Sequence, residues 1–221
     1  MTANQQQIIT ATINYVKETL ENAEGGHDWF HIERVLNNTK LIASSEEVDE
    51  FVVLLGALLH DIADAKFYDG DETVGPKKAT EFLKTQQVAS EIIDEVVFII
   101  DNISYKNSLD PNFKLELTPE LAVVQDADRL DAIGAIGIAR CFNYGGFKNR
   151  PMYNPAISPN VNQDKETYKK SAAPTINHFY EKLLLLKDKM NTETGRKIAK
   201  ERHLYMEKFL EQFYNEWNGI K

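Results

Sequence analysis

The sequence predicts an all-α protein folded as a single helical bundle, and three observations support this. Apolar residues recur at intervals of three and four along nearly the whole chain, the period of a helix with one buried face. No convincing run alternates polar and apolar residues with the period of a half-buried β-strand. Capping residues and prolines stand where the periodic segments begin, as they do at helix N-termini.

In the first half of the chain, glycine, proline and capping residues mark the helix boundaries. Gly25 and Gly26 end the first periodic segment. Ser44 and Glu47 have the spacing of a capping box, which predicts a helix start, and Pro76 suits the first position of a short helix. The helices expected in this half therefore cover about residues 6–22, 28–44, 44–64, 76–85 and 90–103.

Two segments are unusually rich in apolar or small residues. Residues 51–59 are apolar on every side, which predicts a helix at the centre of the core. A later helix is expected from the cap at Thr118, with Pro119 at its first position, to about Phe142. It contains glycines and alanines at 132–139. Glycine costs about 1 kcal/mol in a helix, so a closely packed neighbouring helix must compensate.

Residues 143–174 differ in composition from the helical segments before them. They hold Gly145, Gly146 and four of the seven prolines, which predicts a mobile lid or binding loop at about 143–174. Two amphipathic helices then close the chain. No repeat or interdomain linker is visible, so residues 1–221 are expected to form one domain. The apolar positions of the two closing helices are Ile176, Phe179, Leu183, Leu186 and Met190, and Ile198, Phe209, Phe213 and Trp217.

Composition excludes several classes of protein. Thirty-four acidic and 25 basic residues give a net charge of −9, which argues against a protein that grips a nucleic-acid backbone. A small anionic substrate is still compatible with this net charge, because a bound metal ion reverses the electrostatic field inside its pocket. The apolar run 51–59 is shorter than the roughly 20 residues that span a bilayer, and residues 1–10 show no signal peptide. With Cys141 as its single cysteine, the chain is expected to be cytoplasmic, with no membrane partner.

Four residues form a candidate metal site. His60 and Asp61 end the most apolar helix, and Asp128 interrupts an apolar stripe of a later helix. A carboxylate at such a position is costly unless something positive meets it. Each residue taken singly also has a structural explanation. His60 is compatible with a hydrogen-bonded core histidine, His31 with a solvent-facing position, and Asp61 with neutralising a nearby arginine or lysine. Asp128 is compatible with an ion pair to Arg129 or Arg140, or with capping a neighbouring helix. Together, two imidazoles and two carboxylates from three helices suit a divalent cation with open positions for water and substrate.

The order His, His-Asp, Asp resembles the signature of the HD superfamily of metal-dependent phosphohydrolases. A valine four residues after the first histidine selects His31 rather than His27, and an apolar side chain two residues after the last aspartate selects Asp128 rather than Asp126. The likeness extends over most of the chain to single-domain bacterial HD hydrolases of about this length. The segments that carry it are GHDWFH at 26–31, HIERV at 31–35, GALLHDI at 56–62, DADRLDA at 126–132, GAIGIAR at 134–140 and NTETG at 191–195.

This resemblance implies one divalent metal ion per chain, held by His31, His60, Asp61 and Asp128. The mixed imidazole and carboxylate shell favours Mn²⁺, with Mg²⁺, Co²⁺, Ni²⁺, Fe²⁺ and Zn²⁺ as alternatives. By the same resemblance, Asp64 acts near the attacking water or the leaving group; its alternative is an exposed acid at a helix end. Two-metal phosphodiesterases and di-iron oxygenases of this fold need further histidines before the last aspartate, and this chain has none from Asp61 to that point.

Five residues are candidates for holding the substrate. Lys66, Lys106, Arg140 and Arg150 are expected to bind phosphate oxygens, and His178 to face the pocket. Each of the four cations also suits a solvated surface charge. Aromatic residues such as Phe142, Tyr144, Phe147 and Tyr153 either stack on a base or anchor the loop.

Several cations and a metal suit a substrate with more than one phosphate, and HD relatives act largely on nucleotides. We therefore expect a nucleoside or deoxynucleoside triphosphate pyrophosphohydrolase. A deoxynucleoside 5′-monophosphatase and a non-catalytic nucleotide sensor are the alternatives. The base, the sugar and the oligomeric state are left open by the sequence.

Overall fold

The computed structural model describes residues 1–21, 23, 28–63, 68, 71–104, 115–161 and 172–220. Over these residues it contains nine α-helices and one 3₁₀ helix, and no β-strand, which confirms the all-α prediction. The described residues group into two compact units, Met1–Asp128 and Arg129–Lys221, and each is described by itself. The single domain over 1–221, with a mobile segment at about 143–174, stays a prediction.

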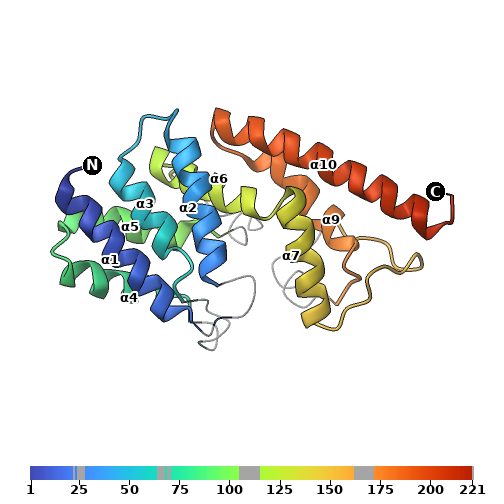
Figure 1. Cartoon of the computed structure of the whole chain (residues 1–221), viewed down its shortest axis with the longest axis horizontal. Helices are drawn as coiled ribbons and strands as arrows, with labels where there is room; N and C mark the ends of the chain where they lie inside the picture. Colours follow the sequence, from blue (N-terminus) through green and yellow to red (C-terminus); the bar gives the residue numbers. More distant parts are fainter. Residues whose placement is uncertain are drawn as a thin grey trace. The chain divides into compact units, whose positions relative to one another are not determined.

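The first unit is built around α3 (Glu50–Leu59). This helix packs against α1, α2 and α5 (Figure 1), and every residue from Phe51 to Leu59 is buried, as predicted. A Cβ on Gly56 would lie 3.0 Å from Cδ1 of Ile99 in α5 and 3.5 Å from Cγ2 of Val124 in α6, so its missing side chain lets both helices approach. The other helices of this unit are α1 (Ala3–Thr19), α2 (Trp29–Ala43), α4 (Val74–Thr85), α5 (Ser90–Asn102) and most of α6 (Pro119–Asp131).

The predicted start of this central helix at Ser44 is wrong. The Ser44 hydroxyl donates to the Leu41 carbonyl (2.8 Å) at the end of α2. The N-cap of α3 is Asp49, whose Oδ1 accepts from the amides of Phe51 (2.8 Å) and Val52 (3.2 Å). Asp49 thus satisfies two of the amides that have no partner within the first turn, and the helix begins five residues later than the cap predicted at Ser44. The helix ends at Leu59 instead of Asp64, which lies outside the described residues.

The second unit contains the last residues of α6 followed by α7 (Gly134–Phe147), α9 (Asn177–Glu181), the 3₁₀ helix η3 (Leu183–Lys189) and α10 (Glu193–Trp217). Helix α10 packs against α7 and η3, and η3 packs against α9. The first closing helix is therefore a short α-helix continued by a 3₁₀ helix.

The helix predicted from 118 to 142 is in fact two helices. Gly134 has a φ of +78°, which side chains other than glycine rarely adopt, and the chain turns there between α6 and α7. Helix α7 then continues to Phe147, so Gly145 lies in a helix and not in the predicted loop. A Cβ on Gly145 would lie 2.2 Å from Oγ1 of Thr175, so glycine is what allows residue 175 to pack against α7.

The aromatic residues beside the predicted loop pack inside the second unit. The ring of Tyr153 meets that of Trp217 edge to face, with 4.9 Å between centroids, and Phe142 lies 6.0 Å from Phe209. These contacts favour the anchoring role over stacking on a base.

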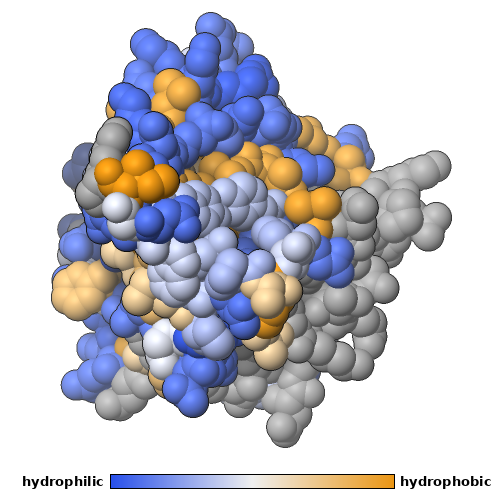
Figure 2. Space-filling model, turned by 90° about the vertical axis from the view of Figure 1, so that its right-hand side faces the viewer, coloured by the Kyte–Doolittle hydropathy of each residue, from blue (hydrophilic) through white to orange (hydrophobic). Residues whose placement is uncertain are grey.

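On the face shown in Figure 2, a band of hydrophobic residues runs between hydrophilic ones, and weakly polar residues fill the centre. No helix in the described part of the chain has the length and hydrophobicity to cross a membrane.

Candidate metal centre

Two histidines of the first unit are held in place by local hydrogen bonds. His31 is the third residue of α2, and its amide donates to the carboxylate of the N-cap Asp28 (3.0 Å). His60 follows the last residue of α3, and its Nδ1 lies 2.9 Å from the Ala57 carbonyl oxygen. A carbonyl only accepts, so Nδ1 carries the proton and Nε2 presents a lone pair.

Those Nε2 atoms meet a carboxylate of α6. The Nε2 atoms of His31 and His60 are 3.3 Å apart, and Oδ1 of Asp128 lies 3.6 Å from the first and 3.8 Å from the second. All three ligand atoms lie within 4.8 Å of one another. The two histidine side chains are at most 5% exposed, whereas that of Asp128 is 34% exposed, so the cluster opens to solvent on the aspartate side.

This donor set fits a divalent metal ion. The Nε2 lone pair of His60 points at a second imidazole nitrogen, an arrangement that needs either a shared proton or a cation between the rings. Asp128 adds a negative charge beside both rings. Two imidazoles and one carboxylate are ligands that Mn²⁺, Fe²⁺, Co²⁺, Ni²⁺ and Zn²⁺ accept.

The remaining members of the predicted site divide into two groups. Asp61 directly follows His60 and is described, but it is not part of the cluster of three ligand atoms, so its role as a fourth ligand stays a prediction. Asp64, Lys66 and Lys106 lie outside the described residues, and their predicted roles stay predictions.

The predicted substrate residues Arg140, Arg150 and His178 all lie in the second unit. The Arg140 guanidinium forms an ion pair with the carboxylate of Asp131, whose side chain is 2% exposed. It also donates to the Asp131 carbonyl (3.3 Å). Arg140 therefore serves the end of α6, and its predicted contact with phosphate would come in addition to this pair.

Arg150 and His178 lie in one positively charged cluster with a residue that sequence reasoning missed, Lys182. Burial, together with the smaller effects of the positive charges of Lys182 and Arg150, lowers the pKa of His178 to about 3. The guanidinium of Arg150 lies 5.5 Å from the centroid of the Tyr144 ring. Lys182 comes four residues after His178, the spacing of neighbours on a helix, and this signal was available in the sequence.

The sequence places Asp128 on a buried stripe of α6, but the structure leaves its side chain 34% exposed. Asp126 and Asp131 are at most 1% exposed, whereas Asp128, the one that meets the histidines, is partly exposed. A ligand that leaves room for water and substrate must reach solvent, so partial exposure is the better criterion for such a site.

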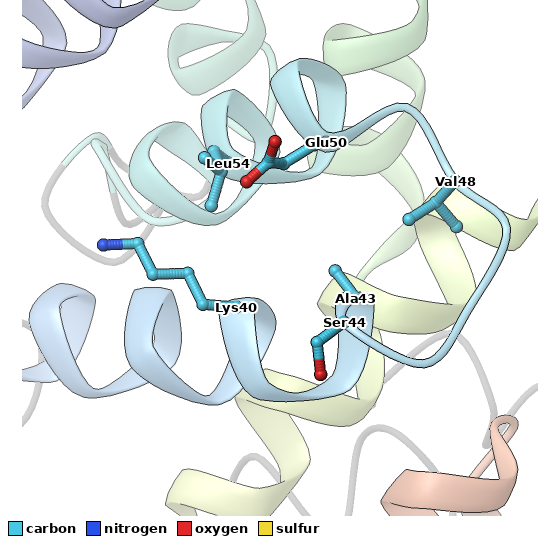
Figure 3. Close-up of a pocket in the computed structure, with 6 residues that line it drawn as sticks. All are labelled: Lys40, Ala43, Ser44, Val48, Glu50 and Leu54. Carbon is cyan, nitrogen blue, oxygen red and sulfur yellow. The ribbon is translucent and has the colours of Figure 1, made fainter. Parts of the chain in front are cut away.

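A separate pocket of about 300 Å³ lies at the other end of α2. Figure 3 shows Lys40 on α2 and Ser44 directly after its last residue, Glu50 and Leu54 on α3, and Val48 in the connection between the two helices. Lys40 is nine residues from His31, about 13 Å along the helix. The residues that line this pocket include no histidine, and it is not the candidate centre.

Comparisons with known proteins agree with this geometry. The sequence model of the HD domain matches residues 29–133, which include His31, His60 and Asp128. The protein YpgQ of Bacillus subtilis is 36% identical over 206 residues, covering 93% of this chain and 92% of YpgQ.

Solved structures extend the likeness to the whole chain. A Lactobacillus plantarum protein has a TM-score of 0.84 at 35% identity and covers 96% of this chain and 98% of its own. An HD-superfamily hydrolase of Bacillus thuringiensis has a TM-score of 0.76 at 43% identity, covering 97% and 98%. YpgQ in complex with ADP has a TM-score of 0.77 at 34% identity, covering 96% of each chain.

Proposed function

Because the chain belongs to the HD-domain family, we propose that it is a metal-dependent phosphohydrolase that acts on nucleotides. One observation carries the proposal: the ligand atoms of His31, His60 and Asp128 lie within 4.8 Å of one another. The similarity to the HD-superfamily hydrolase of Bacillus thuringiensis supports the reaction class.

The residues of the cluster divide the work of holding such an ion. The hydrogen bond from His60 Nδ1 to Ala57 fixes the tautomer that leaves Nε2 free to ligate. The N-cap bond to Asp28 fixes the start of α2, and with it His31. Asp128 supplies the negative charge, and Asp61 is proposed as the fourth ligand. Mn²⁺ is the favoured ion. Such an ion supplies Lewis acidity: it neutralises charge on a phosphoryl oxygen and makes water more acidic.

We assign the proton transfer and the binding of phosphate to other residues. Asp64 accepts a proton from the attacking water or orients it. Lys66 and Lys106 balance the charge of the non-bridging oxygens, as do Arg140 and Arg150, and His178 faces the pocket.

A nucleoside or deoxynucleoside triphosphate, cleaved to the monophosphate and pyrophosphate, is the favoured substrate. YpgQ has been crystallised with ADP, a nucleotide that carries more than one phosphate. The four cations proposed to bind phosphate are also more than a substrate with a single phosphate needs. A deoxynucleoside 5′-monophosphatase is the alternative reaction, and a nucleotide sensor without catalysis is the alternative use of the scaffold.

A comparison of turnover tests the proposal. A triphosphate and its monophosphate are incubated with the protein under identical conditions, once with each of several divalent metals, and the products are separated by chromatography. Pyrophosphate release from the triphosphate is expected. Faster phosphate release from the monophosphate would contradict the polyphosphate preference, and binding without turnover of either would favour the sensor.

A further inference from the structure

A buried asparagine joins the helix of His31 to the helix of Asp128. Asn38 lies in α2 and is 9% exposed, and its Nδ2 donates to the carbonyl oxygen of Ala127 in α6 (3.2 Å). Ala127 immediately precedes Asp128. The bond therefore ends one residue from a candidate ligand and starts on the helix that carries another.

Asn38 also shares a helix face with His31. Seven residues separate them, which is about 20° short of two full turns and about 10 Å along the helix axis. Both face the interior, where Ile32, Val35 and Ile42 supply an apolar surface. Packing alone would favour an apolar side chain at position 38, because burying an amide is costly unless its hydrogen bonds are made.

We propose that Asn38 is a positioning residue for the metal centre, setting the register between α2 and α6; this rests on the proposed metal-dependent function. Ligand distances in a metal site tolerate only about 0.2 Å of error. Asp28 holds α2 at one end, before His31, and Asn38 holds it on the other side. A slide or rotation of α2 along α6 would separate the His31 Nε2 atom from Oδ1 of Asp128, and the Asn38 bond opposes that movement.

The neighbouring residue Thr39 provides a matched control. It is fully buried in the same helix, and its hydroxyl has no hydrogen-bond partner among the described residues. Thr39→Val removes a buried polar group from α2 without removing a link to α6, and Asn38→Leu removes the link.

The experiment measures Mn²⁺ affinity of the wild type and both variants by calorimetry. It also records the imidazole nitrogen resonances of His31 and His60 by NMR in the metal-free proteins. Asn38→Leu is expected to lose about 10-fold or more in affinity, as for other partners outside the ligand shell, and to shift these resonances. Thr39→Val is expected to match the wild type in both. If Asn38→Leu does not fold, Asn38→Ala is judged by the same comparison.

The possible failures are distinguishable. Wild-type affinity and unshifted resonances in the Asn38 variant overturn the positioning role and leave the proposed function intact. An equal loss in both variants also overturns it, because a general loosening of α2 would then be the cause. A wild-type protein that binds no divalent metal overturns the proposed function, and the inference with it.

Discussion

Replacing Asp128 by alanine separates metal binding from folding. Asp128 offers one of the three clustered ligand atoms and the only negative charge among them. Its side chain is 34% exposed, so the free energy of unfolding of the metal-free variant should lie within about 1 kcal/mol of that of the metal-free wild type. Its helical circular dichroism should persist, while its bound metal and its activity should be lost.

The effect is large enough to appear in thermal melts. At a metal concentration of about 100 times Kd, binding stabilises the folded state by about 2.7 kcal/mol. For a chain of 221 residues, this raises Tm by about 5–11 °C. If Asp128→Ala weakens binding about 100-fold, the same concentration stabilises the variant by only about 0.4 kcal/mol, or about 1 °C.

A control is needed because a chain with a net charge of −9 attracts divalent cations generally. Asp188→Ala removes a carboxylate that is 75% exposed and belongs to no cluster of metal ligands among the described residues, so this variant should keep the full rise in Tm. Elemental analysis of dialysed protein gives the occupancy directly. Full occupancy and an undiminished rise in Tm for Asp128→Ala would show that Asp128 is not a ligand.

Three further predictions concern single residues. Asp64→Asn should keep its metal but lower kcat by about 10²- to 10⁴-fold in steady-state assays, because it is assigned to the water; an unchanged kcat would make it an exposed helix-end acid. Arg140→Met should destabilise the protein by about 2 kcal/mol in urea unfolding, since it removes a charged hydrogen bond to the buried carboxylate of Asp131, which keeps the attraction of Arg202. A loss of stability below about 1 kcal/mol would contradict this. Burial lowers the pKa of His178 from 6.5 to about 3, so unfolding takes up a proton between these values. The neutral His178 therefore contributes fully to stability above pH 6.5, and this contribution declines as the pH falls towards 3. In His178→Gln, the urea midpoint should change less between pH 7 and pH 4 than it does in the wild type. Equal pH dependence of the urea midpoint in the two proteins would refute this.

Much of the fold was predictable because its signals are local. The apolar run at 51–59 identified the central helix, and the helical period excluded strands. His31 and His60 stand out because histidines are few and both lie at the edges of apolar helices. Choosing Asp128 over Asp126 needed the resemblance to a known family, since burial alone favours Asp126.

Other features depend on residues that are distant in the sequence. Ser44 and Asp49 are both good helix caps, but the amide of Asp49 also donates to the carboxylate of Glu120 in α6 (3.1 Å). The pairing of Arg140 with Asp131 follows a helix break at Gly134, whose positive φ the helical period does not reveal. The bond from Asn38 to Ala127 spans 89 residues and leaves no local pattern.

The central position of α3 has a consequence for synthesis on the ribosome. Its apolar surface is covered partly by Ile99 of α5 and by Val124 of α6, which are translated after it. At about 5–20 residues per second, the nascent chain carries this uncovered segment for several seconds. A fragment that stops before α5 should therefore be insoluble or bound to a chaperone, whereas one that extends through α6 can cover α3 and leave the ribosome unaided.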